Sequence, residues 1–305
     1  MSAQVTTNLP TAEARAFEHQ VAGHGGVYSL ANGMIAKPCC EMEYAFYEQS
    51  ASFPEFQNFL PRFYGTLRLA TPSEKAMLEN TDDAETIIQN PTDVPNPEQV
   101  CICIEDVSHG FRKPSILDIK LGTRLYDDDA TPEKRARMIA KAEGTTSASL
   151  GVRVCGLKVF DRDTKAYTVY PREFGRKLKD DTLFDAICKF FPPTLDRKYR
   201  LSIIEGFLEE MNEYLSVVEK SELRMYSASV LFIYEGDPLG ESPVEKEKEE
   251  EDESDDEGGH SLDFRVIDFA HSRWSVGAGP DEQYLFGLRN TMKLFSDLRD
   301  TVATE

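Results

Sequence analysis

Apolar residues recur along this chain with two spacings, and each spacing predicts a type of secondary structure. Short apolar runs and alternating segments predict strands at residues 27–30, 34–37, 63–69, 100–104, 114–122, 150–160, 166–170, 224–234 and 264–271. Segments with helical periodicity or clear start signals predict helices at residues 41–48, 131–143, 179–190, 196–220 and 281–298. The chain is therefore expected to combine strands and helices along its length.

The strand predicted at Pro114–Gly122 differs from the others because charges interrupt its apolar residues. Asp118 and Lys120 stand two positions apart, so a strand directs both side chains to the same face. A carboxylate and an ammonium on an otherwise apolar element are costly to bury unless they are paired or used. The residues alone leave two interpretations open, a structural ion pair or a pair of functional groups.

Two more predicted strands end in charged residues of a kind that kinase folds use. Lys37 closes a strand that follows the hairpin signal Asn32-Gly33, and kinase-like folds place an ATP-phosphate lysine at such a position. Asp268 follows an apolar strand, as the metal-binding aspartate of the D-F-G sequence does in protein kinases. A solvated lysine and a capping aspartate are the plainer alternatives.

The helix predicted at residues 131–143 has a basic face. Thr131 is a suitable N-cap, and Pro132 is a suitable first helical residue. The basic residues on one face are Lys134, Arg137 and Lys141. A substrate with several phosphates needs such a face in an acidic protein, whereas a solvated helix surface could show the same spacing. These residues alone do not choose between the two.

The charge balance narrows the classes of partner. The 305 residues suit one large domain or two lobes, and they carry 54 acidic against 34 basic residues, a formal charge of −20. This balance argues against direct nucleic-acid binding and against anionic membranes. Eleven acidic residues lie within residues 241–257, so the segment 236–260 is predicted to be a disordered acidic insert. No apolar run approaches the roughly 18 residues of a membrane span.

The six cysteines predict neither a zinc site nor a disulfide framework. None of them forms a C-x-x-C pair, and no histidine spacing of the zinc-site type accompanies them. We expect reduced thiols in an intracellular protein. The first twenty residues contain no apolar core segment, so no signal peptide is expected.

Four separated stretches together resemble the inositol polyphosphate kinase family. They are the P-x-x-x-D-x-K-x-G pattern of Pro114–Gly122, and Ala228–Leu231, Ile267–His271 and Tyr284–Leu288. The similarity covers residues 17–300. One stretch departs from the family pattern, because the usual Ser-Ser-Leu-Leu reads Ala228-Ser229-Val230-Leu231 in this chain. The second serine of the pattern is kept as Ser229, and the first is replaced by Ala228.

Within the family the chain looks most like the multikinases. The stretch His19–His24, the compact size, the acidic insert and the lack of a long N-terminal regulatory extension all favour them. The resemblance implies an α+β, two-lobed fold related to protein kinases, ATP-grasp enzymes and SAICAR synthase, with ATP in the inter-lobe cleft. Its expected parts are a flexible N-terminus at 1–18, an N-terminal lobe at 19–106 and a C-terminal lobe at 107–305.

The resemblance also implies roles for individual residues in binding the nucleotide. Lys37 is expected to contact the ATP phosphates, and Asp118 is expected to bind the ribose. The backbones of Glu105 and Val107 are expected to bind adenine, which suits a polar hinge after an apolar strand. Each of these roles comes from the resemblance and not from the spacing of the residues.

The remaining implied roles concern phosphoryl transfer and the second substrate. Lys120 and Asp268 are the expected catalytic residues, and Lys120 is expected to touch both the transferred phosphate and the inositol substrate. Asp268 is expected to hold Mg²⁺, with Ser229 as a further candidate ligand. The candidates for inositol phosphate contacts are Lys120, Lys134, Arg137, Lys141 and His271. No residue stands out in the sequence as a base for the substrate hydroxyl.

The expected function is ATP- and Mg²⁺-dependent phosphorylation of inositol 1,4,5-trisphosphate to the tetrakis- and pentakisphosphate. The alternative enzymes are an inositol hexakisphosphate kinase and a strict inositol trisphosphate 3-kinase. An alternative of another class is a nuclear scaffold or transcriptional co-regulator built on a kinase fold. We expect a location in the nucleus or cytoplasm, with the acidic insert as a surface for nuclear protein partners.

Overall fold

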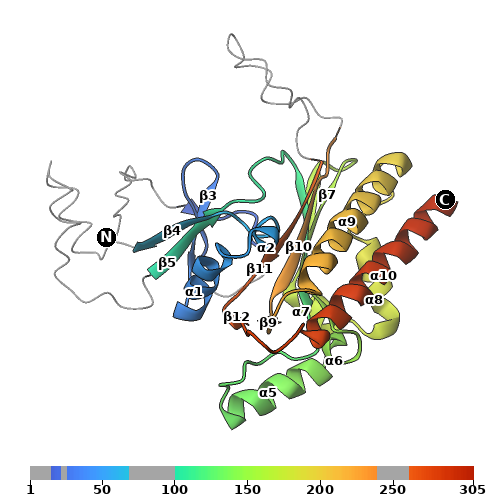
Figure 1. Cartoon of the computed structure of the whole chain (residues 1–305). Helices are drawn as coiled ribbons and strands as arrows, with labels where there is room; N and C mark the ends of the chain where they lie inside the picture. Colours follow the sequence, from blue (N-terminus) through green and yellow to red (C-terminus); the bar gives the residue numbers. More distant parts are fainter. Residues whose placement is uncertain (1–14, 22–25, 69–99, 239–260) are drawn as a thin grey trace, which may run out of the picture. The chain divides into compact units, whose positions relative to one another are not determined.

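The computed structural model describes residues 15–21, 26–68, 100–238 and 261–305, which form two compact units (Figure 1). The first unit contains the described residues of 15–20, 26–40, 62–68 and 100–106. The second contains Val21 and the described residues of 41–61 and 107–305. The predicted N-terminal tail and the acidic insert lie almost entirely outside the described residues.

The first unit is an antiparallel five-stranded sheet with the strand order β1-β2-β3-β5-β4. Its strands are β1 (Arg15–Ala16), β2 (Tyr28–Ser29), β3 (Met34–Pro38), β4 (Phe63–Arg68) and β5 (Val100–Glu105). Asn32 and Gly33, with φ of 59° and 66°, join β2 to β3. β2 and β3 pair antiparallel on either side of these residues, so the predicted hairpin is confirmed.

The second unit is built on another antiparallel sheet, with the order β11-β10-β6-β7-β8. Its strands are β6 (Pro114–Leu121), β7 (Val152–Asp161), β8 (Ala166–Tyr170), β10 (Ser229–Glu235) and β11 (Leu262–Ile267). The predicted strand with two charges is β6, the middle strand of this sheet. Its apolar side chains are fully or almost fully buried: Ile116, Leu117, Ile119 and Leu121.

Helices α9 and α10 lie side by side, and α9 also contacts β11 (Figure 1). The described helices are α1 (Glu41–Ser50), α2 (Pro54–Gln57), α5 (Pro132–Glu143), α6 (Thr146–Leu150), α7 (Arg172–Lys177), α8 (Asp180–Cys188), α9 (Arg197–Val218) and α10 (Glu282–Thr304). Phe207 on α9 and Phe295 on α10 meet Phe232 of β10, with ring centroids 5.2 and 4.8 Å from the Phe232 ring. Such aromatic contacts join the helix layer to the sheet.

Two strands predicted as continuous are interrupted. The segment 224–234 consists of β9 (Leu223–Met225), which pairs with β12 (Ser272–Trp274), and of β10. Between them Ser227 has a φ of 61°, and after β11 Asp268 has a φ of 68°. A left-handed residue ends a strand ladder, and the apolar pattern on either side does not reveal it. The strand predicted to reach His271 therefore ends at Ile267.

The predicted boundary between the lobes differs for residues 41–61, which belong to the second unit. The physical reason is an aromatic contact that joins α1 to the segment after β11. Phe46 stacks on Phe269, with ring centroids 4.2 Å apart. Burial of two stacked rings stabilises a helix against the element that it covers, although this helix is adjacent in sequence to the first unit.

Three glycines allow α10 to approach the end of β6 closely. Gly122 has a φ of 94° and donates its N–H to the carbonyl oxygen of Gly151 at 2.9 Å. A Cβ on Gly287 of α10 would lie 2.2 Å from that oxygen and 2.9 Å from the Gly122 nitrogen. The glycine of the Tyr284–Leu288 stretch is therefore required by a backbone contact beside the strand that carries Lys120.

We expect Gly287→Ala to lower the free energy of unfolding by about 2 kcal/mol or more, the order of an overpacking penalty. The reason is that the added methyl group meets backbone atoms, which cannot rotate away. Gly144→Ala is the control, because Gly144 has a φ of −76° and its Cβ would lie 3.3 Å from the Ala140 oxygen. Urea unfolding of both variants, followed by circular dichroism, would contradict the prediction if the two lost equal stability.

Candidate functional site

Charged side chains from adjacent strands of the second unit meet at one end of its sheet. In the ladder register, Ser229 of β10 stands opposite both Lys120 of β6 and Ile267 of β11. Asp268, the next residue, lies with its carboxylate Oδ2 3.9 Å from Lys120 Nζ. Lys120 Nζ also donates to the carbonyl oxygen of Ser227. The structure thus brings together the two residues predicted to be catalytic.

Backbone geometry and packing hold Asp268 in place. Its φ of 68° is left-handed, which costs free energy in most residues but is tolerated by aspartate. The following residue, Phe269, is completely buried, and its N–H donates to Glu43 Oε1 at 3.2 Å. A buried ring and a hydrogen-bonded backbone next to the strained residue fix the direction of its carboxylate.

Asp118 is buried in the same place, with 2% of its surface exposed. Burial, followed by repulsion from Asp268, raises the pKa of Asp118 to about 6, although Lys120, the Ser229 hydroxyl and Arg153 act in the opposite direction. Its Oδ1 accepts no hydrogen bond from any residue that the structure describes. A nearby cation would stabilise a carboxylate that is buried in this way.

The oxygen atoms at this point suit a hard divalent cation such as Mg²⁺. Two carboxylates, Asp118 and Asp268, are electrostatically coupled, and the Ser229 hydroxyl is beside them. Magnesium typically takes one or two protein carboxylates and completes its shell with water and substrate phosphates. Within the described residues there is no group of three or more histidine, cysteine or acidic side chains that would form an all-protein metal site. The donor set therefore fits a metal shared with a nucleotide.

Positive charge concentrates next to these carboxylates. Arg153 of β7 stands opposite Lys120 in the ladder, with 6% of its surface exposed, and its Nη1 has no hydrogen-bond partner in the described parts of the chain. Desolvation lowers the pKa of Lys141, and the neighbouring charges of Arg153, Lys120 and Arg176 lower it further. A cluster of mutually repelling cations is the electrostatic requirement for binding a polyanion.

Helix α7 brings Arg176 to this cation cluster because it packs directly on β7. A Cβ on Gly175 would lie 2.0 Å from the carbonyl oxygen of Val154. Only glycine permits that distance between a helix and the backbone of a strand. The cation cluster, defined as Lys120, Lys141, Arg153 and Arg176, therefore draws on two strands and two helices.

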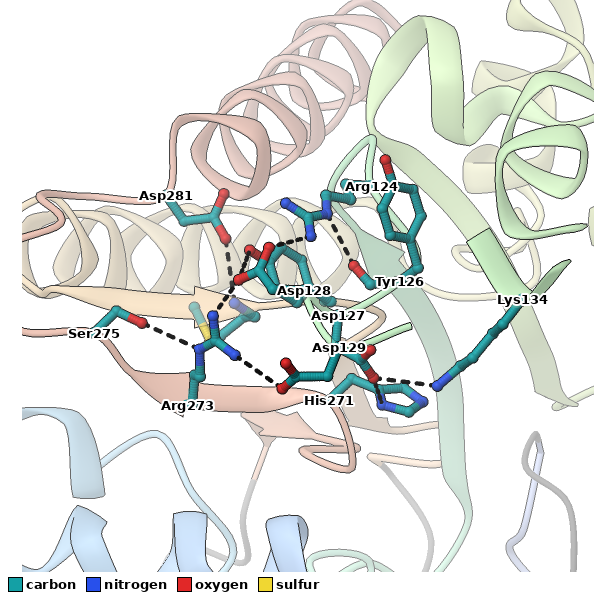
Figure 2. A network of polar contacts seen from close by, with 12 residues as sticks. Arg124, Tyr126, Asp127, Asp128, Asp129, Lys134, His271, Arg273, Ser275 and Asp281 are labelled. Atoms are coloured by element: carbon teal, nitrogen blue, oxygen red, sulfur yellow. Dashed lines mark hydrogen bonds and ion pairs between the residues drawn. The ribbon is translucent and has the colours of Figure 1, made fainter. Parts of the chain in front are cut away.

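Asp127 connects two of the predicted substrate-binding residues (Figure 2). Its Oδ2 lies 3.2 Å from Lys134 Nζ on α5 and 2.7 Å from His271 Nδ1. The Asp127 side chain is 8% exposed. Burial and then the charge of Lys134 lower the pKa of His271, while Asp127 raises it and Lys120 lowers it further. The balance keeps the imidazole neutral at neutral pH.

A second network holds the loop that contains Asp127 (Figure 2). The next residue, Asp128, pairs with both Arg124 and Arg273. The Arg124 guanidinium also lies 4.6 Å from the ring centroid of Tyr126 and 4.3 Å from that of Tyr226. These ion pairs and cation–π contacts attach the loop between β6 and α5 to β12 and to the turn before β10.

Three predicted nucleotide-binding residues are not among the side chains of this cluster. Lys37 and Glu105 belong to the first unit, on β3 and at the end of β5. The Glu105 carboxylate accepts the Arg62 N–H at 3.0 Å. Val107 belongs to the second unit and packs with the buried residues Phe111, Ile116 and Ile233. Their contacts with a nucleotide stay predictions, and so does the contact of Asp118 with the ribose.

The side chain of Arg137 is exposed on α5. Helix α5 begins where the sequence predicted. The Thr131 side chain accepts the Lys134 N–H, and Pro132 is the first helical residue. Only Ala142 of this helix is buried. The basic face of α5 is thus presented by a well-capped helix that contributes little to the core.

Sequence reasoning missed Asp127, Arg153 and Arg176. Arg153 had the signal already used for Lys120, a charge within an apolar strand, but it lay in the strand predicted at 150–160 and was not singled out. Asp127 begins a run of three aspartates that looks like an ordinary loop. Its importance depends on His271, a residue 144 positions away, so no local pattern reveals it.

Comparison with known proteins indicates the same family as the sequence motifs. The inositol polyphosphate kinase family model matches residues 101–296. The inositol hexakisphosphate kinase 3 of Mus musculus is 34% identical over 207 aligned residues, and the match covers 65% of this chain and 51% of that protein. The inositol polyphosphate multikinases of Saccharomyces cerevisiae and Schizosaccharomyces pombe are 28% and 29% identical, over 92% of this chain and 97% of each relative. The chain therefore spans about half the length of the hexakisphosphate kinase and nearly all of the two multikinases.

Solved structures agree with these matches. The crystal structure of the inositol phosphate multikinase Ipk2 from S. cerevisiae, in complex with ADP and Mn²⁺, superposes with a TM-score of 0.66. It is 29% identical, and the match covers 87% of this chain and 98% of that chain. A second structure, from studies of an inositol phosphate multikinase, has a TM-score of 0.52 at 23% identity and shows the fold alone. The expected α+β, kinase-like fold is confirmed.

We expect Asp118→Asn to stabilise the protein in metal-free buffer at neutral pH, by on the order of 2 kcal/mol. The folded-state pKa of Asp118, about 6, lies above its ordinary value of 3.8. At a pH below 3.8 the Asp118 carboxyl is protonated in both the folded and the unfolded protein and causes no loss of stability. As the pH rises through about 6, the buried carboxyl has to ionise, and the folded protein loses stability. The gain from the substitution should be largest above neutrality and should shrink on acidification.

Thermal melts at about pH 7.5 and about pH 4.5 measure this difference. Asp163→Asn, at an exposed position between β7 and β8, is the control and should leave both melting temperatures unchanged. A lower melting temperature for Asp118→Asn at the higher pH would show that the ionised carboxylate stabilises the fold.

Proposed function

The chain belongs to the inositol polyphosphate kinase family, and from this premise we propose that it transfers the γ-phosphoryl group of ATP to hydroxyl groups of inositol polyphosphates. The observation that carries the proposal is the convergence of Lys120, Asp268 and the cation cluster at one end of the second sheet. Phosphoryl transfer needs positioning and stabilisation of negative charge more than it needs covalent chemistry. A fixed ammonium, a metal-binding carboxylate and spare cations meet that need.

We propose inositol 1,4,5-trisphosphate and its tetrakisphosphate product as the substrates, with the pentakisphosphate as the final product. The match over nearly the full length of two yeast multikinases supports this choice. Inositol hexakisphosphate is the second candidate substrate, because the identity to the mouse hexakisphosphate kinase 3 is higher, 34% over 65% of this chain. A strict trisphosphate 3-kinase remains the third enzyme alternative.

In this proposal Lys120 acts on the transferred phosphate. Its Nζ is oriented by the Ser227 carbonyl oxygen and by Asp268 3.9 Å away, so little reorganisation is needed when an anionic oxygen arrives. Preorganised positive charge of this kind stabilises the charge that develops in the transition state. Asp268 would hold Mg²⁺ with help from Asp118 and Ser229, and the metal would neutralise phosphate charge when bound.

The remaining cations would bind the phosphates of the inositol ring. Lys120, Arg153 and Arg176 act electrostatically on Lys141, and Lys134 and Arg137 extend the basic face along α5. Binding a polyphosphate relieves the repulsion among these cations, so each new contact is charge-assisted. The specificity for one inositol phosphate over another then depends on which phosphates reach which cations.

The decisive experiment incubates the purified chain with ATP, Mg²⁺ and either inositol 1,4,5-trisphosphate or inositol hexakisphosphate, and resolves the products by anion-exchange chromatography. Stepwise conversion of the trisphosphate through two more charged products supports the multikinase proposal. A single product would indicate a strict 3-kinase, and a product from hexakisphosphate alone would indicate the second candidate. No product from either would favour a scaffold on a kinase fold.

We expect Asp268→Asn to lower kcat by roughly 10³-fold or more while the protein stays folded, because the loss of metal stabilisation costs several kcal/mol of barrier. Asp300→Asn is the matched control, since Asp300 is an exposed residue on α10 that pairs with Arg299. Steady-state kinetics with a thermal melt of each variant is the measurement. Turnover near the wild-type rate in folded Asp268→Asn would refute the metal-ligand assignment.

We expect the double variant Lys134→Gln/Arg137→Gln to raise KM for the inositol phosphate by about tenfold or more, the order of one or two charged hydrogen bonds. KM for ATP should stay within about twofold, because these residues are assigned to the other substrate. Arg135→Gln on the same helix is the control, since Arg135 lies 5.4 Å from the ring centroid of Tyr126. Equal changes in both KM values would show that the helix acts through the fold.

Location and protein partners stay separate proposals. We propose a nuclear or cytoplasmic protein, with the acidic segment 236–260 available to basic nuclear partners because of its charge. None of the helices among the described residues is both long and apolar enough to cross a membrane. Microscopy of the fluorescently tagged chain, with and without that segment, tests both proposals, and an identical distribution of the two forms would count against the partner role.

A further inference from the structure

Phosphoryl transfer to an alcohol releases a proton, and one part of the site is built to receive it. Asp127 and His271 come from different elements, the loop between β6 and α5 and the turn between β11 and β12. They meet with His271 Nδ1 2.7 Å from Asp127 Oδ2, next to the predicted substrate cations (Figure 2). A buried carboxylate against one nitrogen of an imidazole is the arrangement that prepares the other nitrogen for proton transfer.

We propose that His271 Nε2 accepts the proton of the attacking inositol hydroxyl, with Asp127 as its positioning residue, an inference that rests on the proposed kinase function. The hydroxyl oxygen forms the new bond to the γ-phosphorus of ATP. The bond from that phosphorus to the bridging oxygen breaks, and its electron pair leaves with ADP. The hydroxyl proton passes to Nε2, so that protons and charges balance without any further reactant.

The geometry assigns the proton of the neutral imidazole to Nδ1. A nitrogen lone pair cannot lie 2.7 Å from a carboxylate oxygen without repulsion, so a proton must stand between the two atoms. Nδ1 is buried from solvent, and its 2.7 Å approach to Asp127 is an ion-pair contact without the near-linear geometry of a full hydrogen bond. With Nδ1 protonated, the lone pair of the neutral ring is on Nε2. The exposed 34% of the side chain belongs to atoms other than Nδ1.

The surrounding charges favour a neutral base in the free protein and a stronger base in the complex. Burial, Lys134 on α5 and Lys120 on β6 lower the pKa of His271 against the opposing effect of Asp127. The imidazole is therefore ready to accept a proton near neutral pH. A bound polyphosphate would offset the charges of both lysines, which raises the proton affinity of Nε2 when the substrate is in place.

Asp127 can hold the imidazole of His271 in one orientation because ion pairs also hold the loop that contains Asp127. The adjacent Asp128 pairs with Arg124 and with Arg273, so the backbone at Asp127 cannot shift freely. After the transfer, the partly exposed ring of His271 can return the proton to solvent. Asp127 thus stabilises the imidazolium during the reaction and the Nδ1–H tautomer before it.

The test compares His271→Asn with wild type in single-turnover phosphorylation of inositol 1,4,5-trisphosphate between about pH 5 and pH 8. The asparagine amide can still donate toward Asp127 but has no nitrogen that accepts a proton. We expect the rate to fall by about 10²- to 10³-fold, the range of general-base contributions. KM for the inositol phosphate should change by less than about threefold, and the acidic limb of the wild-type kcat/KM profile should disappear.

Asp127→Asn provides an independent arm. Its amide can donate to Nδ1, which moves the proton of the neutral ring to Nε2 and blocks proton acceptance. We expect a comparable loss of rate and a reversed tautomer in the ¹⁵N spectrum of the His271 ring. His109→Asn, the same substitution at an exposed histidine outside the site, should leave both the rate and the pH profile unchanged.

The possible outcomes distinguish failure of the proton-acceptor role of His271 from failure of the proposed kinase function. A folded His271→Asn variant that keeps its rate and its acidic limb, with a higher KM, makes His271 a binding residue and overturns the inference alone. A wild-type ring protonated on Nε2 overturns it as well. If the wild-type chain phosphorylates no inositol phosphate, the proposed function fails, and the proton acceptor fails with it.

Discussion

The charge of Lys120 within an apolar sheet is the constraint around which the second unit is arranged. Its side chain is only 13% exposed, so its desolvation has to be offset by nearby negative groups. The Ser227 carbonyl oxygen and the Asp268 carboxylate supply them, and both come from residues with left-handed backbones. The two left-handed residues that interrupt otherwise regular strands thus both present an oxygen atom to one ammonium.

Like charges close to Lys120 favour the binding of ligands of opposite charge. The carboxylates of Asp118 and Asp268 repel each other, and the cations of Lys120 and Arg153 repel that of Lys141. Each repulsion raises the free energy of the ligand-free fold and is relieved when a cation joins the carboxylates and phosphates join the lysines and arginines. The arrangement costs stability in the free protein and favours the simultaneous binding of metal and polyphosphate.

Close backbone packing provides the rigidity that such a site needs. Gly287 lets α10 press against the end of β6, and Gly175 lets α7 press against β7. Both contacts are made by backbone atoms, which have no rotamers to change, so the strands that carry Lys120 and Arg153 are held firmly. The loop network of Arg124, Asp128 and Arg273 does the same for Asp127 with ion pairs instead of packing.

The sequence by itself determined the elements and the identity of the central charged strand, because periodicity, caps and turn residues act over a few positions. It thus predicted the hairpin at Asn32-Gly33 and the start of α5 at Pro132. Only the tertiary structure decided that α1 belongs with the second unit, through the stacking of Phe46 on Phe269, and that Asp127 joins His271. These contacts connect residues more than a hundred positions apart, and their free energy comes from burial and Coulomb interactions that no local pattern records.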